Sequence, residues 1–241
     1  MSSILSVGEN MDKKMAYIVK EQKRIADLVI KKFPDYYLTG GTALAFYFDH
    51  RFSEDLDFFS QKYQKSDPEK IMKYILKETG FKYQLDAVQD GPKFVPMKVF
   101  FLQLKDKQIL KIDFVKDFVS NVGPIENGIH SIDDIYLRKL YAAIGMEGKK
   151  SDTGHAIPTG RQSVKDLFDI YYLSSEYKPV SDVFFEYFPY NQAERLDAWY
   201  RGFDRVETKL SLTDLVPKVD PIKVFKYLDD QILKKIPNKL R

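Results

Sequence analysis

The spacing of apolar residues changes along the chain and predicts a mixed first half and a helical second half. In residues 11–33 apolar side chains recur every three or four positions, which predicts one amphipathic helix. Residues 35–39 are expected to form a short strand that Gly40-Gly41 ends, and a short helix is expected over 42–48. The pattern then predicts a strand over 55–60, a helix over 67–79 with Ser66 as its N-cap, and strands over 81–88, 93–104 and 108–115, the last two joined by a hairpin turn at 105–107.

Helical periodicity dominates from Ser131 onward. Ser131 is a candidate N-cap for a helix that reaches Ile144, and the polar, glycine-rich residues 145–160 favour a loop. Further helices are predicted over 163–174, 180–200 and 221–234. The chain is therefore predicted to be an α+β protein, with a mixed β-sheet core and flanking helices in residues 1–125 and a helical domain in residues 126–241.

Composition narrows the chemistry that this fold can carry. The chain has no cysteine, and its three histidines, His50, His130 and His155, are too scattered to suggest a zinc site. A bound metal is therefore expected to be a hard cation held by oxygen. No apolar stretch approaches the roughly 18 residues of a transmembrane helix, and residues 1–10 show no secretory signal, so a cytoplasmic protein without a membrane partner is expected.

Two further groups of side chains have two interpretations each. The net charge of +3 does not by itself indicate nucleic-acid binding, but basic residues of the first helix either contact phosphates or form a solvated helix face: Lys13, Lys14, Lys20, Lys23, Arg24, Lys31 and Lys32. Aromatic residues near the C-terminus either belong to the core or form a stacking surface for bases: Phe184, Phe185, Tyr187, Phe188, Tyr190, Trp199 and Tyr200.

The glycine pair Gly40-Gly41 lies at a predicted strand-to-helix turn. Glycine lets the backbone approach a ligand closely, and the helix N-terminus behind the pair offers amide groups suited to phosphate. Taken alone, the pair is more simply a tight turn.

Asp55 and Asp57 are expected on one face of their strand, roughly 7 Å apart, with Leu56 and Phe58 on the opposite, apolar face. Two carboxylates in this arrangement repel each other unless a cation lies between them. The alternative is a pair of exposed aspartates at a strand end, or a salt bridge with Arg51.

Asp113 is the third carboxylate of the predicted site. Ile112 and Phe114 share one strand face, so Asp113 falls on the other, and a strand beside that of Asp55 would bring the three carboxylates together. Carboxylates converging from two strands suit two Mg²⁺ or Mn²⁺ ions about 3.5–4 Å apart, as in-line phosphoryl transfer requires.

A family resemblance adds to this interpretation. The strings Thr39-Gly-Gly-Thr-Ala-Leu and Arg51-Phe-Ser-Glu-Asp-Leu-Asp-Phe-Phe resemble the AbiEii/AbiGii-type nucleotidyltransferase toxins, relatives of the MenT toxins in the DNA polymerase β-like superfamily. The resemblance continues in Ser131-Ile-Asp-Asp-Ile-Tyr-Leu-Arg-Lys-Leu-Tyr-Ala-Ala and Arg161-Gln-Ser-Val-Lys-Asp-Leu-Phe-Asp-Ile-Tyr-Tyr-Leu, and it covers roughly residues 30–175.

The resemblance implies a nucleotidyltransferase-like fold and an enzyme that moves NMP from an NTP to an acceptor hydroxyl of RNA or tRNA, with Mg²⁺ or Mn²⁺ as cofactor. It also implies the toxin of a toxin–antitoxin or phage-defence system, with a winged-helix antitoxin as partner. The same core would support a housekeeping or antibiotic-modifying nucleotidyltransferase. A domain that binds nucleotide without turnover is the non-enzymatic alternative, against which the three carboxylates argue.

The resemblance assigns further site residues in the helical half. Lys139 is expected over the nucleotide phosphates and Asp166 near the active site, in a cleft between the two parts of the chain. The alternatives are a solvated lysine on a helix face and an exposed Lys165–Asp166 salt bridge. Arg51 orients Asp55 or contacts phosphate. Replacing Lys139 by alanine is expected to lower turnover and leave folding nearly intact, and replacing Arg138 to do little.

The glycine turn departs from the Gly-Ser pattern of the superfamily. Gly40 and Gly41 are expected to cradle the triphosphate, with a hydroxyl supplied by Thr42 or Ser53 in place of the missing serine. Asp55, Asp57, Asp113, Lys139 and Asp166 are the predicted catalytic residues.

Overall fold

The structure, a computed structural model, describes residues 2–91, 94–145, 149–150, 156–157 and 159–239. Its contacts group the chain into two compact units, Met1–Tyr47 with Phe52–Ser131 and Phe48–Arg51 with Ile132–Arg241. The division into two domains at residue 125 stays a prediction.

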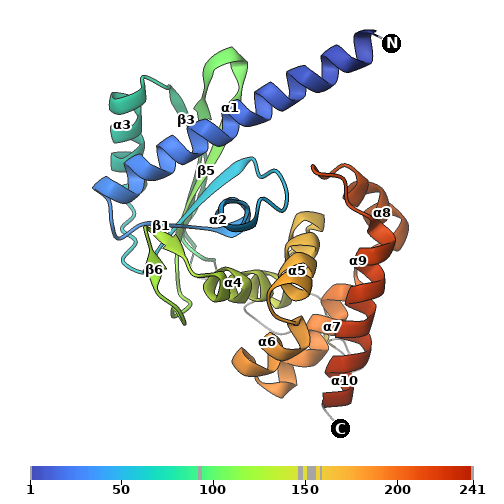
Figure 1. Cartoon of the computed structure of the whole chain (residues 1–241). Helices are drawn as coiled ribbons and strands as arrows, with labels where there is room; N and C mark the ends of the chain where they lie inside the picture. The colour runs from blue at the N-terminus through green and yellow to red at the C-terminus, as the bar shows by residue number, and fades with distance from the viewer. Residues whose placement is uncertain (1, 92–93, 146–148, 151–155, 158, 240–241) are drawn as a thin grey trace. The chain divides into compact units, whose positions relative to one another are not determined.

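The first unit is built around a seven-stranded mixed sheet (Figure 1). Its elements in chain order are α1 (Ser2–Lys32), β1 (Tyr37–Thr39), α2 (Gly40–Phe48), β2 (Asp55–Ser60), α3 (Asp67–Thr79), β3 (Tyr83–Gln89), β4 (Met97–Gln103), the 3₁₀ turn η1 (Lys105–Lys107), β5 (Ile109–Lys116), β6 (Ile125–Glu126) and β7 (Ile129–His130).

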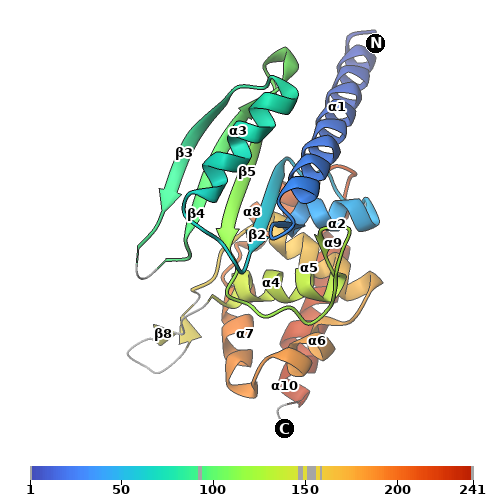
Figure 2. The same ribbon diagram turned by 90° about the vertical axis from the view of Figure 1, so that its left-hand side faces the viewer.

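The strand order in this sheet is β3-β4-β5-β2-β1-β7-β6. Strands β2 and β5 are parallel, as are β1 and β7, whereas the other neighbouring pairs are antiparallel. Helix α1 packs against α3 and β1, and α3 covers one side of the sheet (Figures 1 and 2). The predicted α+β fold with a mixed sheet and flanking helices is confirmed.

One face of the central strands forms the core of this unit. Leu56 and Phe58 of β2 and Ile112 and Phe114 of β5 are fully buried, and so are apolar residues of α1 and α3, namely Ile25, Val29, Ile71, Met72 and Ile75. Asp55 and Asp57 alternate with these residues along β2 and are only partly buried. The alternation read from the sequence therefore separates an apolar face from a polar one.

Among its described residues, the second unit is helical apart from one short strand pair. It contains α4 (Ile132–Ile144), β8 (Lys149–Lys150), β9 (Ala156–Ile157), α5 (Val164–Glu176), α6 (Val180–Tyr187), the 3₁₀ turn η2 (Tyr190–Gln192), α7 (Ala193–Arg201), α8 (Arg205–Thr213), α9 (Pro221–Leu228), the π-helical η3 (Asp229–Lys235) and α10 (Ile236–Lys239). The predicted loop over 145–160 thus contains the antiparallel pair β8–β9, and His155 lies outside the described residues.

The single helix predicted over residues 180–200 is wrong. Helix α6 ends at Tyr187, and Phe188 is extended with φ −119° and ψ 140°. The cause is Pro189, which has no amide hydrogen and disfavours helical backbone in the residue before it. The helix resumes as α7 at Ala193. The core interpretation of the aromatic residues holds for Phe184, Phe188, Trp199 and Tyr200, which are buried, and not for Tyr190, which is 65% exposed.

Ser66 is the N-cap residue of α3, as predicted, but its side chain does not cap the helix. Ser66 stands at the N-cap position with helical φ and ψ, and its hydroxyl makes no capping hydrogen bond. Pro68 lacks one of the two amides that such a hydroxyl can accept from, and the helical backbone of Ser66 departs from the extended conformation of a residue with a capping side chain. Charges at the helix start remain favourable, because Asp67 and Glu69 lie in the first turn.

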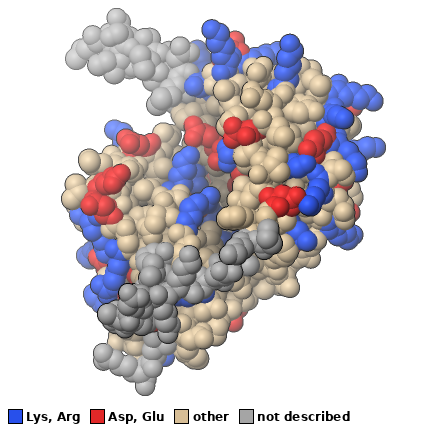
Figure 3. All heavy atoms as spheres, turned by 180° about the vertical axis from the view of Figure 1, so that it is seen from behind, with Lys and Arg blue, Asp and Glu red and all other residues tan. Residues whose placement is uncertain are grey.

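The surface carries mixed charge. Lys and Arg are interspersed with Asp and Glu on the face shown in Figure 3, which agrees with a net charge of only +3. Among the helices described, none has the length and apolar character needed to cross a membrane.

Candidate active site

The predicted carboxylates lie side by side on the polar face of the sheet. Asp57 of β2 pairs in register with Asp113 of β5, and Asp55 pairs with Lys111. Residues directly opposite on neighbouring strands have Cβ atoms about 4.5–5.5 Å apart, and residues two apart on a strand share a face. Asp55, Asp57, Lys111 and Asp113 therefore occupy four adjacent positions on one face.

The glycine turn lies directly against this face. On the other side of β2, Thr39 of β1 is the register partner of Asp57, and Gly40 follows it at the start of α2. Gly40 has φ +72°, and a Cβ placed on it would lie 2.2 Å from Oδ2 of Asp57. Only glycine fits both the left-handed backbone and this contact. The turn and the Asp57 carboxylate are thus neighbours.

Lys111 is a site residue that sequence reasoning missed. Its Nζ lies 2.6 Å from Oδ2 of Asp113, with side-chain exposures of 35% and 11% respectively. Burial lowers the pKa of Lys111, but the hydrogen bond to Asp113 and the charges of Asp113, Asp55 and Asp57 outweigh burial and hold that pKa above its ordinary value. The signal in the sequence was the position of Lys111 two residues before Asp113, on the same strand face.

The fit of a divalent cation rests on the donor set and its placement. Three carboxylates and one ammonium on adjacent positions leave two negative charges, and carboxylate oxygens are the ligands that Mg²⁺ prefers. The side chains do not converge, and no group of three or more acidic or histidine residues among those described could hold an ion as it stands. Asp57 is directed at Gly40 and Asp113 at Lys111. Donor chemistry and strand register therefore fit the ion, and the side-chain directions would have to change.

The two hydroxyl groups proposed for phosphate have structural contacts. Thr42 is buried and its hydroxyl donates to the backbone carbonyl of Asp55. Ser53 is also buried, and its carbonyl accepts a hydrogen bond from Gln22 Nε2 at 2.8 Å. Thr42 thus ties α2 to the strand of carboxylates. A phosphate contact by either hydroxyl stays a prediction.

A buried polar network includes Thr39, the register partner of Asp57 on β1. Thr39 Oγ1 shares a 3.0 Å hydrogen bond with Nδ1 of His130, whose ring centroid lies 4.2 Å from that of Tyr37. The Tyr37 hydroxyl donates to Asp117 at 2.8 Å. All four residues are buried, so the network fixes the end of β1 from which the glycine turn begins. These residues are far apart in sequence and gave no signal.

The second unit contains a buried cluster of ions around Lys139. Its Nζ lies 2.6 Å from Asp166 and 2.7 Å from Asp169, and the lysine is 7% exposed. Asp169 also accepts from Arg51 at 2.6 and 2.8 Å and from His50 Nε2 at 2.8 Å. Asp166 accepts from Arg161 at 2.8 Å.

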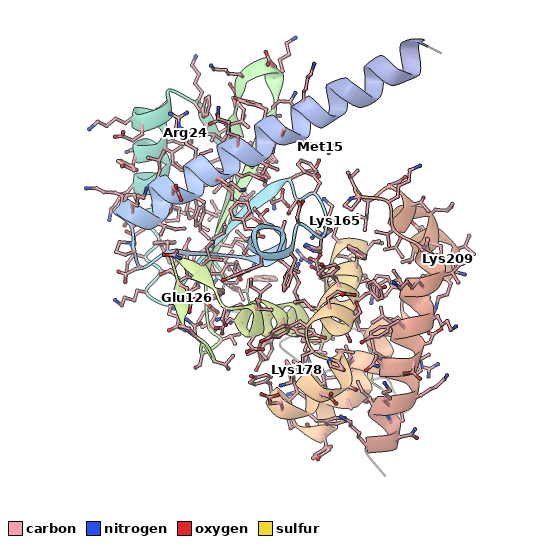
Figure 4. The ribbon with its side chains drawn as sticks, in the orientation of Figure 1. Met15, Arg24, Glu126, Lys165, Lys178 and Lys209 are labelled. Carbon is pink, nitrogen blue, oxygen red and sulfur yellow. The ribbon has the colours of Figure 1, made fainter. Side chains whose placement is uncertain are left out.

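Helical spacing explains how this cluster forms. Asp166 and Asp169 are three residues apart on α5 and therefore share one side of it. The hydroxyl of Ser163 caps the same helix by accepting from the Asp166 amide. Lys165, which directly precedes Asp166, is exposed, whereas Asp166 and Asp169 are buried (Figure 4).

Electrostatics keeps the ions of the cluster charged. Burial lowers the pKa of Lys139, but the charges of Asp169 and Asp166 outweigh burial and the opposing Arg51, so this pKa lies above its ordinary value. Burial would raise the pKa of Asp169, yet Lys139, Arg51 and the hydrogen bond from His50 hold it well below its usual range.

Several expectations about these residues are corrected by the cluster. Lys139 does not lie on a solvated helix face, and Asp166 is not half of an exposed pair with Lys165, because Lys139 and Asp166 are buried together. Arg51 contacts Asp169, which neither proposed role foresaw. Arg138 is nearly buried too, 3.1 Å from Asp134. Replacing Lys139 or Arg138 therefore breaks a buried ion pair and is expected to destabilise the fold. The orientation of Lys139 toward Gly40 stays a prediction.

Gly40→Ala is expected to disturb the site beyond the effect of backbone strain. A left-handed alanine costs about 1–2 kcal/mol, and the new Cβ would also push the Asp57 carboxylate aside. Gly80→Ala is the matched control, since Gly80 has φ +73° and no atom within 4 Å of the added Cβ. Urea unfolding should show a larger loss for Gly40→Ala, and nucleotidyl transfer should fall in that variant alone. Equal losses in both would show that Gly40 serves the backbone only.

Comparison with known proteins gives two matches. Residues 28–234 match the family model of the nucleotidyl transferase AbiEii toxin of type IV toxin–antitoxin systems. A solved structure described as that of a nucleotidyltransferase from H. pylori is similar with a TM-score of 0.55 and 21% sequence identity, over 92% of this chain and 96% of that chain. At this identity the likeness shows the fold alone. No curated protein matches the chain.

Proposed function

The chain belongs to the AbiEii nucleotidyltransferase toxin family of type IV toxin–antitoxin systems, and from this membership we propose that it transfers NMP from an NTP to an acceptor hydroxyl of RNA, in particular tRNA, in a reaction that depends on Mg²⁺ or Mn²⁺. The observation that carries the proposal is the row formed by Gly40, Asp57 and Asp113, in which a glycine turn at a helix N-terminus adjoins two paired carboxylates.

Each part of this row has a task in the proposed reaction. Asp55, Asp57 and Asp113 would hold the divalent cation, which supplies charge stabilisation to the phosphates as pyrophosphate leaves. The Gly40-Gly41 turn and the amides at the start of α2 bind the triphosphate, since backbone N–H groups at a helix N-terminus favour anions. Asp113, which pairs in register with Asp57, would hold the cation and help to activate the attacking hydroxyl.

Lys139 adds a positive charge to this scheme. Its ammonium has three donors, two of which meet Asp166 and Asp169. We assign the third to a phosphate oxygen of the nucleotide, with Asp166 holding the amine in place. The two carboxylates keep the amine protonated, so it can donate at neutral pH.

The biological role follows from the family. We propose that the chain is the toxin of a cytoplasmic toxin–antitoxin pair whose antitoxin carries a winged-helix domain. Modification of the acceptor end of tRNA would stop translation, which is a direct route from nucleotidyl transfer to toxicity.

The proposal is tested by incubating the protein with each α-labelled NTP and either total tRNA or an aminoglycoside, with Mg²⁺ or with EDTA. Label should enter RNA from a subset of the NTPs, with Mg²⁺ only. Label transferred to an aminoglycoside and not to RNA would instead support the antibiotic-modifying alternative. Nucleotide binding without transfer to either acceptor would support the non-catalytic one.

A further inference from the structure

The pairing of Lys111 with Asp113 has no role in the scheme above. Lys111 stands at the register position beside Asp55 and two residues before Asp113, on the face of the proposed site. A partly exposed lysine–carboxylate pair contributes only about 0–1 kcal/mol to folding. A contribution to folding stability therefore does not explain why the Lys111 ammonium lies among three carboxylates.

The lysine and a divalent cation would compete for one carboxylate. The ammonium lies 2.6 Å from Asp113 Oδ2, which is the distance of a charge-assisted hydrogen bond. A Mg²⁺ ligand oxygen needs to direct its lone pair at the ion, at about 2.1 Å. With Asp113 bound to the cation, the ammonium loses its hydrogen-bond acceptor and meets a second positive charge, which favours its departure.

The side chain has both the freedom and the surroundings to move. Lysine carries a point charge on a flexible four-carbon stem, and 35% of the Lys111 side chain is exposed. On β4 its register partner is Phe101, a half-buried aromatic residue along which the apolar stem can lie. In the proposed reaction the NTP binds together with the cation, and its triphosphate offers the ammonium a new anionic partner.

We propose that Lys111 exchanges partners during substrate binding: it neutralises Asp113 before the divalent cation arrives and then binds a phosphate of the incoming NTP. The inference rests on the proposed function and adds to it a phosphate-binding residue. No bond is made or broken in the exchange; the ammonium keeps its protons and changes only its acceptor.

The test uses Lys111→Met, which keeps the stem and removes the charge, and two binding measurements by calorimetry. With MgCl₂ alone, the variant should bind the ion about three- to tenfold more tightly than the wild type, because a repelling and competing charge is gone. With saturating Mg²⁺ and the α,β-methylene analogue of the best-bound NTP, the variant should bind the nucleotide about ten- to a hundredfold more weakly, because a charge-assisted hydrogen bond is lost. A merely structural residue would not shift these affinities in opposite directions.

Lys98→Met is the matched control, since Lys98 on β4 also pairs with a carboxylate, Glu69, but pairs in register with Phe114 on the opposite, apolar face. It should change neither affinity, and Lys111→Arg should restore nucleotide binding. Unchanged affinity for Mg²⁺, or a fall in both affinities, in Lys111→Met overturns the exchange. If the wild type binds no Mg²⁺, the proposed metal site fails and the exchange fails with it. If the wild type binds Mg²⁺ and Lys111→Met has the same affinities for Mg²⁺ and nucleotide, the exchange is refuted and the proposed metal site is not.

Discussion

Asp57→Asn is expected to abolish nucleotidyl transfer and to leave the protein folded. The substitution removes one charge and almost no volume, from a side chain that stands between Asp113 and the glycine turn. A divalent cation stabilises the transition state of phosphoryl transfer by several kcal/mol, and each 1.36 kcal/mol is a factor of ten in rate. Loss of the central ligand should therefore lower the initial rate of labelled NMP transfer on the order of a thousandfold or more.

The control for this variant is Asp86→Asn on β3. Asp86 is an exposed aspartate of the same sheet, three strands away from β2 in the strand order. Its replacement should leave the rate unchanged, and both variants should unfold within a few degrees of the wild type. An Asp57→Asn protein that keeps more than about a tenth of the activity would remove Asp57 from the catalytic machinery.

Where the alternation or the helical spacing of apolar residues was strong, the sequence predicted the first and last residue of the element. Strand β2 spans Asp55–Ser60 and helix α3 Asp67–Thr79, both as predicted. In β2 every second residue is buried, so the alternation of apolar and polar residues in the sequence follows the alternation of buried and partly exposed side chains. The hairpin between β4 and β5 also formed without Asn-Gly, because Asp106 and Lys107 take positive φ values of 54° and 59°.

Elements that are too short to show a repeating pattern of apolar residues were not predicted. Strands β6 and β7 have two residues each, yet the turn between them is Asn127-Gly128 with φ values of 51° and 73°. This is the favoured chemistry of a tight hairpin, and it was overlooked because no apolar alternation flanks it. Gly128 is further constrained by Ile30, 2.1 Å from where its Cβ would lie.

The site was only half visible in the sequence. Strand alternation placed the three aspartates on one face, and their side-by-side positions follow from the pairing of β2 with β5. The contact of Arg51 with Asp169 joins residues 118 apart, which no local pattern reports. The i, i+3 spacing of Asp166 and Asp169 was a usable signal, because two aspartates on the same side of an apolar helix need cations when they are buried.

Lys139→Met is expected to lower both the free energy of unfolding and the turnover of the folded protein, and the two effects can be measured separately. Breaking a buried ion pair costs about 3–5 kcal/mol when the remaining charge has no other partner. Here Asp166 retains Arg161, and Asp169 retains Arg51 and His50, so the loss of unfolding free energy should lie at or below the lower end of that range. Turnover at a temperature where the variant is fully folded should fall by orders of magnitude, because a charge on the nucleotide phosphates is lost.

Arg138→Met separates the two effects, because it breaks another buried ion pair on the same helix, with Asp134. Arg138 and Lys139 are adjacent on α4, about 100° apart around the helix, and therefore face different partners. Both variants should unfold at lower urea concentration than the wild type, but Arg138→Met should keep its transfer rate once folded, and Lys139→Arg should regain stability through its charge. If Arg138→Met and Lys139→Met lose stability and turnover in the same proportion, Lys139 acts only as a buried counter-ion that holds α4 to α5. A loss of turnover confined to Lys139→Met places its ammonium on the substrate.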